Sequence, residues 1–416
     1  MRSWKIRDCV YSVYNTANKY LKGIVLSPVF WEYLYLVILS LFLLHYFPQT
    51  IQYPGEWPRL NYNYIHTLLI IFVIFKYAFE DKYTFKKSES ILFFLILLTF
   101  ILSAQYTGYV EVFDTALLIL GARNVRWHLI LQTYLGVKIP LILATIAGSQ
   151  FGLIEDLIYN QHGRIRESFG FIYPTDFAAQ IFFAIVAWVL IRQMKTSFLE
   201  LGIMVLLAAF LKKFCDARCS VICIFLVVCV VFSLKMQKKI HVSSSIRIWV
   251  RKWIRRGCIV VPYVFGGTMI LLCRFYDPDN PLMRTLNSVT SQRLKYGKKT
   301  FDLYDVQMYG QYIEMWGNGG STQRPADYTF IDCSYINILM RFGLLVFAAV
   351  LVLITFLMLR NYHNLLIMGM VVLVCLHSVM EHHLFEIHYN ILLILPFALG
   401  AEARKTKETR NYLTKK

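Results

Sequence analysis

The 416-residue sequence predicts an all-α protein, a polytopic transmembrane helical bundle. Apolar residues make up 57% of the chain and charged residues only 16%. A soluble domain usually has about 25% charged residues, whereas a membrane-spanning helix needs about 20 predominantly apolar residues. The composition therefore excludes a soluble enzyme. A disordered chain is excluded as well, because 31 Phe, 27 Tyr and 8 Trp residues supply too much apolar surface.

Long apolar runs mark about 12 individual spans. The fourth run is the shortest and contains Asp114, which makes it the least typical. In chain order the predicted spans cover residues 29–47, 63–79, 90–107, 109–122, 129–152, 174–191, 197–211, 219–234, 257–273, 334–359, 363–380 and 386–401.

The Lys and Arg residues orient these spans, because basic residues are retained on the cytoplasmic side during insertion. With a cytoplasmic N-terminus, twelve spans return the basic C-terminal tail to the same side, and the inner segments then hold most of the 43 Lys and Arg residues. The formal net charge of +18 thus reports orientation, and we expect no nucleic-acid partner.

This topology divides the chain into alternating inner, outer and spanning segments. The inner loop 235–256 interleaves Lys and Arg with Trp249, Trp253 and Ile254. We interpret it as an amphipathic helix on anionic lipid, with topology alone as the simpler alternative. The predicted segments are a cytoplasmic segment 1–28, spans one to five over 29–152, an outer loop 153–173, spans six to nine over 174–273, a large outer loop 274–333, spans ten to twelve over 334–401 and a cytoplasmic tail 402–416.

The outer loop before span six contains an Arg-x-Arg motif, Arg164 and Arg166 in GRIRESFGFIYP. Alternate side chains of an extended strand share a face. Both guanidiniums would then point to one side and could clamp a phosphate or diphosphate. In the alternative interpretation, either arginine pairs with Glu155, Asp156 or Glu167 and only holds the loop in shape.

Two other outer segments carry cations that the topology does not require. The turn 212–218 places Lys212, Lys213 and Arg218 around Asp216, and Arg218 is the ligand-binding candidate. Snorkelling to lipid headgroups is the alternative for the lysines. The loop 274–333 holds Arg293 and several Tyr and Trp residues, which either stack on sugar rings or pack within a small subdomain.

The large outer loop ends in IDCSYINILMRFG, which brings Asp332 and Tyr335 to the start of span ten. Polar residues at this position can also cap the helix. Arg341 lies about two turns into the span. An arginine within a membrane segment is a functional candidate by default, with pairing to Glu381 or to an acid of another span as the alternative.

The last outer turn, HSVMEHHLFEIHYN, is rich in His and Glu and contains no Lys or Arg. A Glu or His beside arginines can take a proton from an attacking hydroxyl, which makes Glu381 and His382 candidates for a base. Histidine and carboxylate are also zinc ligands, but the HExxH pattern is absent. We therefore expect no metal site.

These motifs together resemble those of Wzy-type polysaccharide polymerases from Gram-positive capsule and exopolysaccharide clusters. GRIRESFGFIYP resembles their GRxRxSFGFxHPN, DARCS their short Ser-Arg turn, IDCSYINILMRFG their DNSYxxLLxxxG, and MEHHLFEIHYN their late Glu-containing turn, in the same order. Tyr173, Thr175 and Cys333 depart from the family pattern, so no catalytic role is assigned to them.

The resemblance implies a fold related to lipid-dependent (GT-C-like) glycosyltransferases and O-antigen ligases. It also implies a metal-independent transferase without a cofactor, in the cytoplasmic membrane of a bacterium, which extends a glycan carried on undecaprenyl diphosphate. The expected catalytic residues are Glu381, His382 and Asp332. The expected substrate-binding residues are Arg164, Arg166, Arg218, Arg293, Tyr335 and Arg341.

The expected partners are the lipid-linked oligosaccharide, membrane lipids, a flippase and a chain-length regulator. Two other functions stay open. An O-antigen-ligase-like enzyme would use the same donor and a different acceptor. A flippase or transporter of lipid-linked oligosaccharides would show internal repeats and polar residues along the middle of the membrane, whereas here the polar residues gather at the predicted outer surface.

Overall fold

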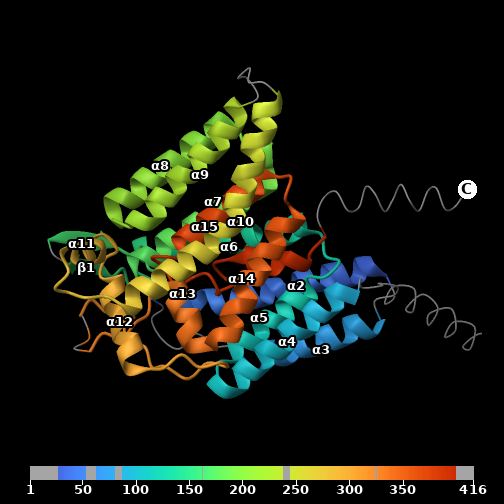
Figure 1. Ribbon diagram of the computed structural model, residues 1–416, viewed down its shortest axis with the longest axis horizontal. Coiled ribbons are helices and arrows are strands. Elements are labelled where there is room, and N and C mark those ends of the chain that lie inside the picture. The colour runs from blue at the N-terminus through green and yellow to red at the C-terminus, as the bar shows by residue number, and fades with distance from the viewer. Residues whose placement is uncertain are drawn as a thin grey trace, which may run out of the picture.

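The computed structural model describes residues 27–52, 62–79, 87–161, 163–237, 244–323, 325 and 327–399. The described chain is mostly α-helical (Figure 1). Six of its helices are long and apolar enough to cross a membrane: Pro28–Thr50, Trp127–Gln150, Pro174–Lys195, Arg218–Met236, Ile248–Arg274 and Ser334–Arg360. The predicted all-α, membrane-embedded fold is thereby confirmed.

The helices of the first half follow the predicted spans. They are α2 (Pro28–Tyr46), followed by the 3-10 turn η1 (Phe47–Thr50), then α3 (Tyr62–Phe79), α4 (Lys87–Thr107), α5 (Val110–Gly121) and α6 (Trp127–Gln150). With 12 residues, α5 is short for a span, but most of its side chains are buried. Asp114 lies within it, 2.6 Å from His66 Nδ1, and accepts a hydrogen bond from Tyr46. A paired carboxylate is thus accommodated inside the bundle.

The middle of the chain begins with a small antiparallel hairpin. Its strands β1 (Ile158–Gln161) and β2 (Arg164–Glu167) pair Tyr159 with Arg166. Helices α7 (Pro174–Arg192), the turn η2 (Gln193–Lys195), α8 (Phe198–Phe214), α9 (Arg218–Met236) and α10 (Ser244–Arg274) follow. A capping box of Ser197 and Glu200 satisfies backbone N–H groups at the start of α8, so this helix begins only a few residues after α7 ends.

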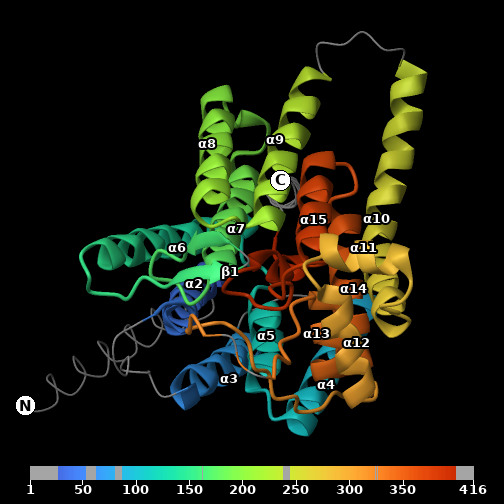
Figure 2. The same cartoon turned by 90° about the vertical axis from the view of Figure 1, so that its left-hand side faces the viewer.

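The basic inner segment differs from the prediction. Its residues 244–256 do not form a separate surface helix but are the first part of α10, a continuous helix of 31 residues. Figures 1 and 2 show this part of α10, together with the end of α9, extending beyond the neighbouring helices. Trp249 and Trp253 are exposed on it. Residues 238–243, the centre of the predicted loop, lie outside the described chain.

The large outer segment contains two helices, α11 (Pro281–Val289) and α12 (Arg293–Leu303), followed by extended chain. Two tyrosines of this segment pack on tyrosines near the end of α4, one in its last turn and one just after it. Tyr309 stacks on Tyr106 and Tyr312 stacks on Tyr109, at centroid distances of 5.0 and 5.6 Å. For this pair of tyrosines the packing alternative is therefore the observed one.

The predicted span 334–359 is not one continuous α-helix. It consists of α13 (Ser334–Asn337), the π-helical turn η3 (Ile338–Phe342) and α14 (Gly343–Arg360). Gly343 has a φ of +93°, a conformation that favours glycine. The outer segment pairs with the break: Leu344 N donates to Gln307 O at 3.0 Å, and Gln311 N donates to Arg341 O at 3.0 Å.

The predicted twelfth span, 386–401, is corrected by the structure. After α15 (Leu365–His377) the chain makes a series of turns and then the 3-10 helix η4 (Ile391–Phe397), whose residues are all buried. A 3-10 helix rises about 2.0 Å per residue and so covers distance with few residues. Backbone that is not α-helical is tolerated at membrane depth where protein surrounds it, which explains how an apolar run fills this place without forming a lipid-facing helix.

Three backbone hydrogen bonds each join two segments that the predicted topology assigns to the same side. On the predicted outer side, Ile172 N donates to Thr50 O and Gly320 N donates to Ile172 O. On the predicted inner side, Leu399 N donates to Val125 O. Segment 377–390 reaches α6 inside the bundle, where Lys138 donates to His388 O and Tyr134 to Tyr389 O, and η4 leads from there to Leu399. The terminal residues 1–26 and 400–416 lie outside the described chain.

Candidate functional site

The hairpin presents the Arg-x-Arg motif as the alternation predicts. Arg164 NH1 donates to Asp216 Oδ2 at 2.8 Å, and Arg166 Nε donates to Cys215 O at 2.9 Å. Both guanidiniums thus reach the turn between α8 and α9. The partner of Arg164 is an acid from a different segment, rather than an acid of its own loop.

A single carboxylate, Asp216, stands among three cations in this turn. It accepts hydrogen bonds from Arg164 and Lys212, and Arg218 Nε lies 3.7 Å away. Burial would raise the pKa of Asp216, but the bonds from Lys212 and Arg164 outweigh it and lower that pKa. The Arg218 side chain remains 62% exposed and that of Arg164 40%. This basic cluster, Arg164, Arg166, Lys212 and Arg218, keeps donors free for an anion.

Arg293 forms a second, more buried centre at the start of α12. Its NH1 lies 3.0 Å from Asp332 Oδ2, and its Nε donates to Met380 O at 2.9 Å. Tyr328 also donates to Asp332, at 3.0 Å. Asp332 thus uses its Oδ2 to anchor α12 and Tyr328 to the start of α13.

Glu381 lies beside this centre and is 4% exposed. Burial raises its pKa to about 7, and the nearby Arg293 guanidinium offsets part of that effect. The loop is fixed because Ser334 Oγ donates to the Glu381 carbonyl and accepts from Leu384 N. Glu381 is thus a buried carboxylate held within the field of one arginine.

Tyr173 connects the two centres. Its hydroxyl accepts a hydrogen bond from Arg166 NH1 at 3.2 Å, the Arg166 guanidinium lies 5.2 Å from its ring, and it also lies within the electrostatic reach of Arg293. No role was predicted for Tyr173, because the sequence pattern that the chain resembles has His at this position. Its position between two site arginines, directly before α7, is visible only in the fold.

The histidines after α15 form a third group. His382 Nε2 lies 3.5 Å from Glu386 Oε1, and His383 Nδ1 lies 2.8 Å from Glu386 Oε2. Asp176, in the first turn of α7, lies 3.5 Å from His383 Nε2. Asp176, His382 and His383 offer three ligand atoms within 4.8 Å of one another. Asp176 was missed by the sequence analysis, because nothing local to YPTDF indicates its distant partners.

Two predicted substrate-binding residues lie elsewhere. Tyr335 is fully buried, and its hydroxyl donates to Cys375 O of α15 at 2.9 Å, so it is a packing residue of the bundle. Arg341 lies 3.6 Å from Glu111 of α5 and stacks over Tyr109. It pairs with an acid of another span, as the alternative interpretation proposed, and that acid is Glu111 rather than Glu381.

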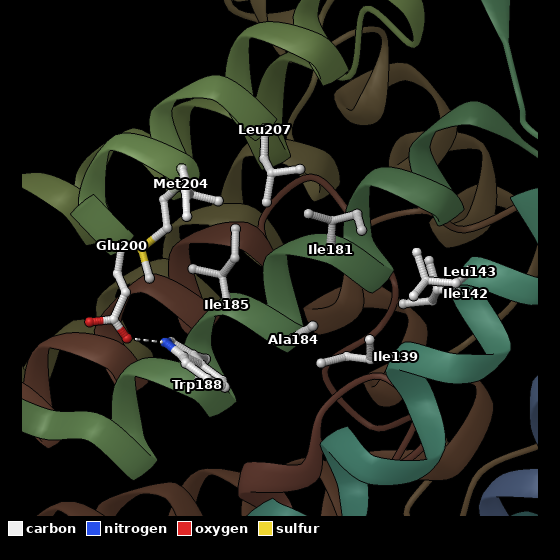
Figure 3. Close-up of a pocket in the computed structure, with 11 residues that line it drawn as sticks. Ile139, Ile142, Leu143, Ile181, Ala184, Ile185, Trp188, Glu200, Met204 and Leu207 are labelled. Atoms are coloured by element: carbon white, nitrogen blue, oxygen red, sulfur yellow. Dashed lines mark hydrogen bonds between the residues drawn. The ribbon is translucent and has the colours of Figure 1, made fainter. Parts of the chain in front are cut away.

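An apolar groove of about 330 Å³ lies between α6, α7 and α8 (Figure 3). Ile142, Ile185 and Leu207 are among its lining residues. At one end the Trp188 indole donates to Glu200 at 2.8 Å. Helix α8 lines the groove and then ends at Phe214, directly before the basic cluster.

In comparisons with known proteins, no protein-family model matches the chain, and no curated protein or solved structure is significantly similar to it.

Proposed function

We propose that this protein is a polysaccharide polymerase that joins undecaprenyl-diphosphate-linked oligosaccharide repeat units. It would act at the outer face of the cytoplasmic membrane of a bacterium, as a relative of the GT-C-like transferases and O-antigen ligases. One observation carries the proposal: Arg293 of α12 lies beside one buried carboxylate, Glu381, and Tyr173 links this centre to Arg166 of β2 in the basic cluster.

The positive charge of the arginines matches the negative charge of the proposed donor, a lipid diphosphate. When the bond between the sugar and the lipid diphosphate breaks, negative charge grows on the departing diphosphate, and fixed guanidiniums stabilise that charge. Arg164, Lys212 and Arg218 are the exposed members of the basic cluster. They share one counter-charge, Asp216, so the cluster as a whole favours a polyanion.

The acidic residues could activate the proposed acceptor, whose hydroxyl must lose a proton. A base must take the proton from the hydroxyl that attacks the anomeric carbon. Asp332 is engaged by Arg293 and Tyr328, and His382 faces Glu386. Glu381 is therefore the base we propose, with Arg293 beside it.

The groove of Figure 3 supports a lipid substrate. Its lining is apolar, and α8 runs from it to the basic cluster. We propose that the polyprenyl tail occupies this groove while the diphosphate meets the cations. We further propose that both termini are cytoplasmic, since η4 leads the chain from the site back to Val125 on the predicted inner side.

The test is polymer formation by the purified protein in lipid nanodiscs supplied with lipid-linked repeat units. We expect a ladder of lipid-linked products on a gel, and loss of about 100-fold or more of the rate in Arg164→Ala and Arg218→Ala, because each removes a donor to the developing charge. The double variant Arg164→Ala/Arg166→Ala should be inactive while repeat units accumulate.

Arg192→Ala is the matched control. Arg192 pairs with Glu200 at 3.1 Å and is 42% exposed, close to the values for Arg164, but it lies at the predicted inner end of α7. Its variant should keep normal activity. Normal-length polymer from the double variant would overturn the proposal, and transfer of the glycan to an acceptor other than a repeat unit would identify a ligase.

A further inference from the structure

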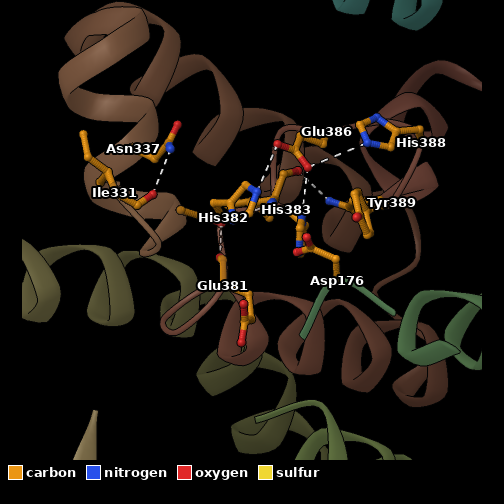
Figure 4. A network of polar contacts seen from close by, with 12 residues as sticks. Asp176, Ile331, Asn337, Glu381, His382, His383, Glu386, His388 and Tyr389 are labelled. Atoms are coloured by element: carbon orange, nitrogen blue, oxygen red, sulfur yellow. Dashed lines mark hydrogen bonds and ion pairs between the residues drawn. The ribbon is translucent and has the colours of Figure 1, made fainter. Parts of the chain in front are cut away.

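We infer that Asp176, His382 and His383 bind a divalent transition-metal ion. This inference goes beyond the proposed polymerase and does not depend on it. The three residues come from two elements that are distant in sequence, the first turn of α7 and the turns after α15 (Figure 4).

One of the spacings between the ligand atoms matches that of two ligands on a shared ion. All three lie within 4.8 Å of one another, and Asp176 Oδ1 is 3.5 Å from His383 Nε2. Zinc binds His nitrogen and carboxylate oxygen at about 2.0–2.2 Å in tetrahedral geometry, which places two ligands of one ion about 3.4 Å apart. The observed separation is longer than a good hydrogen bond and close to this value.

Each of the two histidines has one ring nitrogen that makes no hydrogen bond in the described part of the chain. His382 Nδ1 and His383 Nε2 are both buried and have no hydrogen-bond partner among the described residues. The His383 side chain is only 1% exposed. A buried polar atom without a partner destabilises the folded protein, and a metal ion would satisfy both nitrogens at once.

The opposite nitrogens of the two rings have a partner. Glu386 lies 2.8 Å from His383 Nδ1 and 3.5 Å from His382 Nε2. A carboxylate behind a histidine fixes which ring nitrogen carries the proton and leaves the other free for the metal. Figure 4 shows Glu386 on one side of the two rings and Asp176 on the side of His383 away from it.

Two imidazoles and one carboxylate are ligands typical of zinc and neighbouring divalent metals. Three protein ligands leave a coordination position for water. The ion would join α7 to the turns that follow α15, which also carry Glu381, so its role is to position that segment. His382 and Glu386 side chains are 17% and 30% exposed, which gives the ion a route from solvent.

The experiment measures metal in the full-length protein, purified in detergent, equilibrated with zinc and then dialysed. We expect about one zinc ion per chain by mass spectrometry. Asp176→Asn and His383→Ala should lose it. His363→Ala is the matched control, since His363 is exposed on the predicted inner side, and it should retain the wild-type content.

A second variant keeps the result decisive if His383→Ala fails to fold. Glu386→Gln retains all three ligands but weakens the support of the rings, and the zinc affinity should fall about 10–100-fold. Wild-type protein that holds no zinc, or equal zinc in wild type, Asp176→Asn and Glu386→Gln, would overturn the inference and leave a simple ion pair between His383 and Asp176. Because metal content is read without substrate, the result is independent of polymerisation.

Discussion

At the level of single residues, the outer arginines could be located from sequence, but their partners could not. The period of two in a strand correctly placed Arg164 and Arg166 on one face. The same sequence gives no information about which side of a helix faces the site, and Tyr335 turned out to face α15. Asp176 and Tyr173 joined the site only through folding, because their partners come from other segments.

Glu381 provides the sharpest test at this scale. Glu381→Gln keeps the shape of the side chain but removes the proton acceptor, so we expect polymerisation to fall by about 10²–10⁴-fold. The protein should still insert and accumulate, because the loop is held by the Glu381 carbonyl and Ser334 rather than by the carboxylate. The rate of polymer formation and the amount of membrane-inserted protein are measured together.

The control for this test is Glu111→Gln. Glu111 is also a carboxylate near an arginine on the predicted outer side, but its partner is Arg341 rather than Arg293. Its variant should stay close to the wild-type rate. Full activity of Glu381→Gln would exclude Glu381 as the base and direct attention to His382.

At the level of elements, apolar runs predicted where helices form but not where they break. Helix α7 begins at Pro174, as the predicted span did. The break at η3 depends on the outer segment pairing with Leu344 and Leu345, a contact that no pattern within span ten reveals. Segment 386–401 was mistaken for a span because burial inside the bundle selects apolar residues just as lipid does.

Substitution of Gly343 tests whether the folded protein requires the break between η3 and α14. A side chain there would place its Cβ 2.2 Å from the Gly310 nitrogen, in addition to the strain of a φ of +93°. Such strain alone costs about 1–3 kcal/mol. We expect Gly343→Ala to lower the thermal midpoint of the detergent-solubilised protein by several degrees.

Gly267→Ala is its control. Gly267 lies inside α10, and no described atom outside its own helix lies within 4 Å of the added Cβ. Alanine is favoured over glycine in a helix by about 1 kcal/mol. The midpoint should therefore stay the same or rise. Equal midpoints for both variants would mean that the turn between η3 and α14 adapts to a side chain.

At the level of the whole molecule, charge and chemistry separate onto the two predicted sides. Most of the candidate site lies in segments assigned to the outer side, which are the hairpin, the turn after α8, α12 and the turns after α15, and Asp176 adds the first turn of α7. The basic first part of α10 lies on the opposite side. In the predicted topology the strongly positive net charge belongs to the inner side, whereas the proposed function depends on a few arginines of the predicted outer side that pair with acids.

The orientation itself can be measured by cysteine labelling in intact bacteria, after replacement of the nine native cysteines. Ile165→Cys, on the exposed face of β2, should react with a membrane-impermeant thiol reagent. Lys195→Cys, after α7, and Thr414→Cys, in the tail, should react only after permeabilisation, because basic inner segments are retained in the cytoplasm. Labelling of Lys195→Cys alone in intact cells would reverse the orientation and place the arginine site away from extracytoplasmic substrates. Labelling of Thr414→Cys together with Ile165→Cys would mean that the buried 3-10 segment does not return the chain to the inner side.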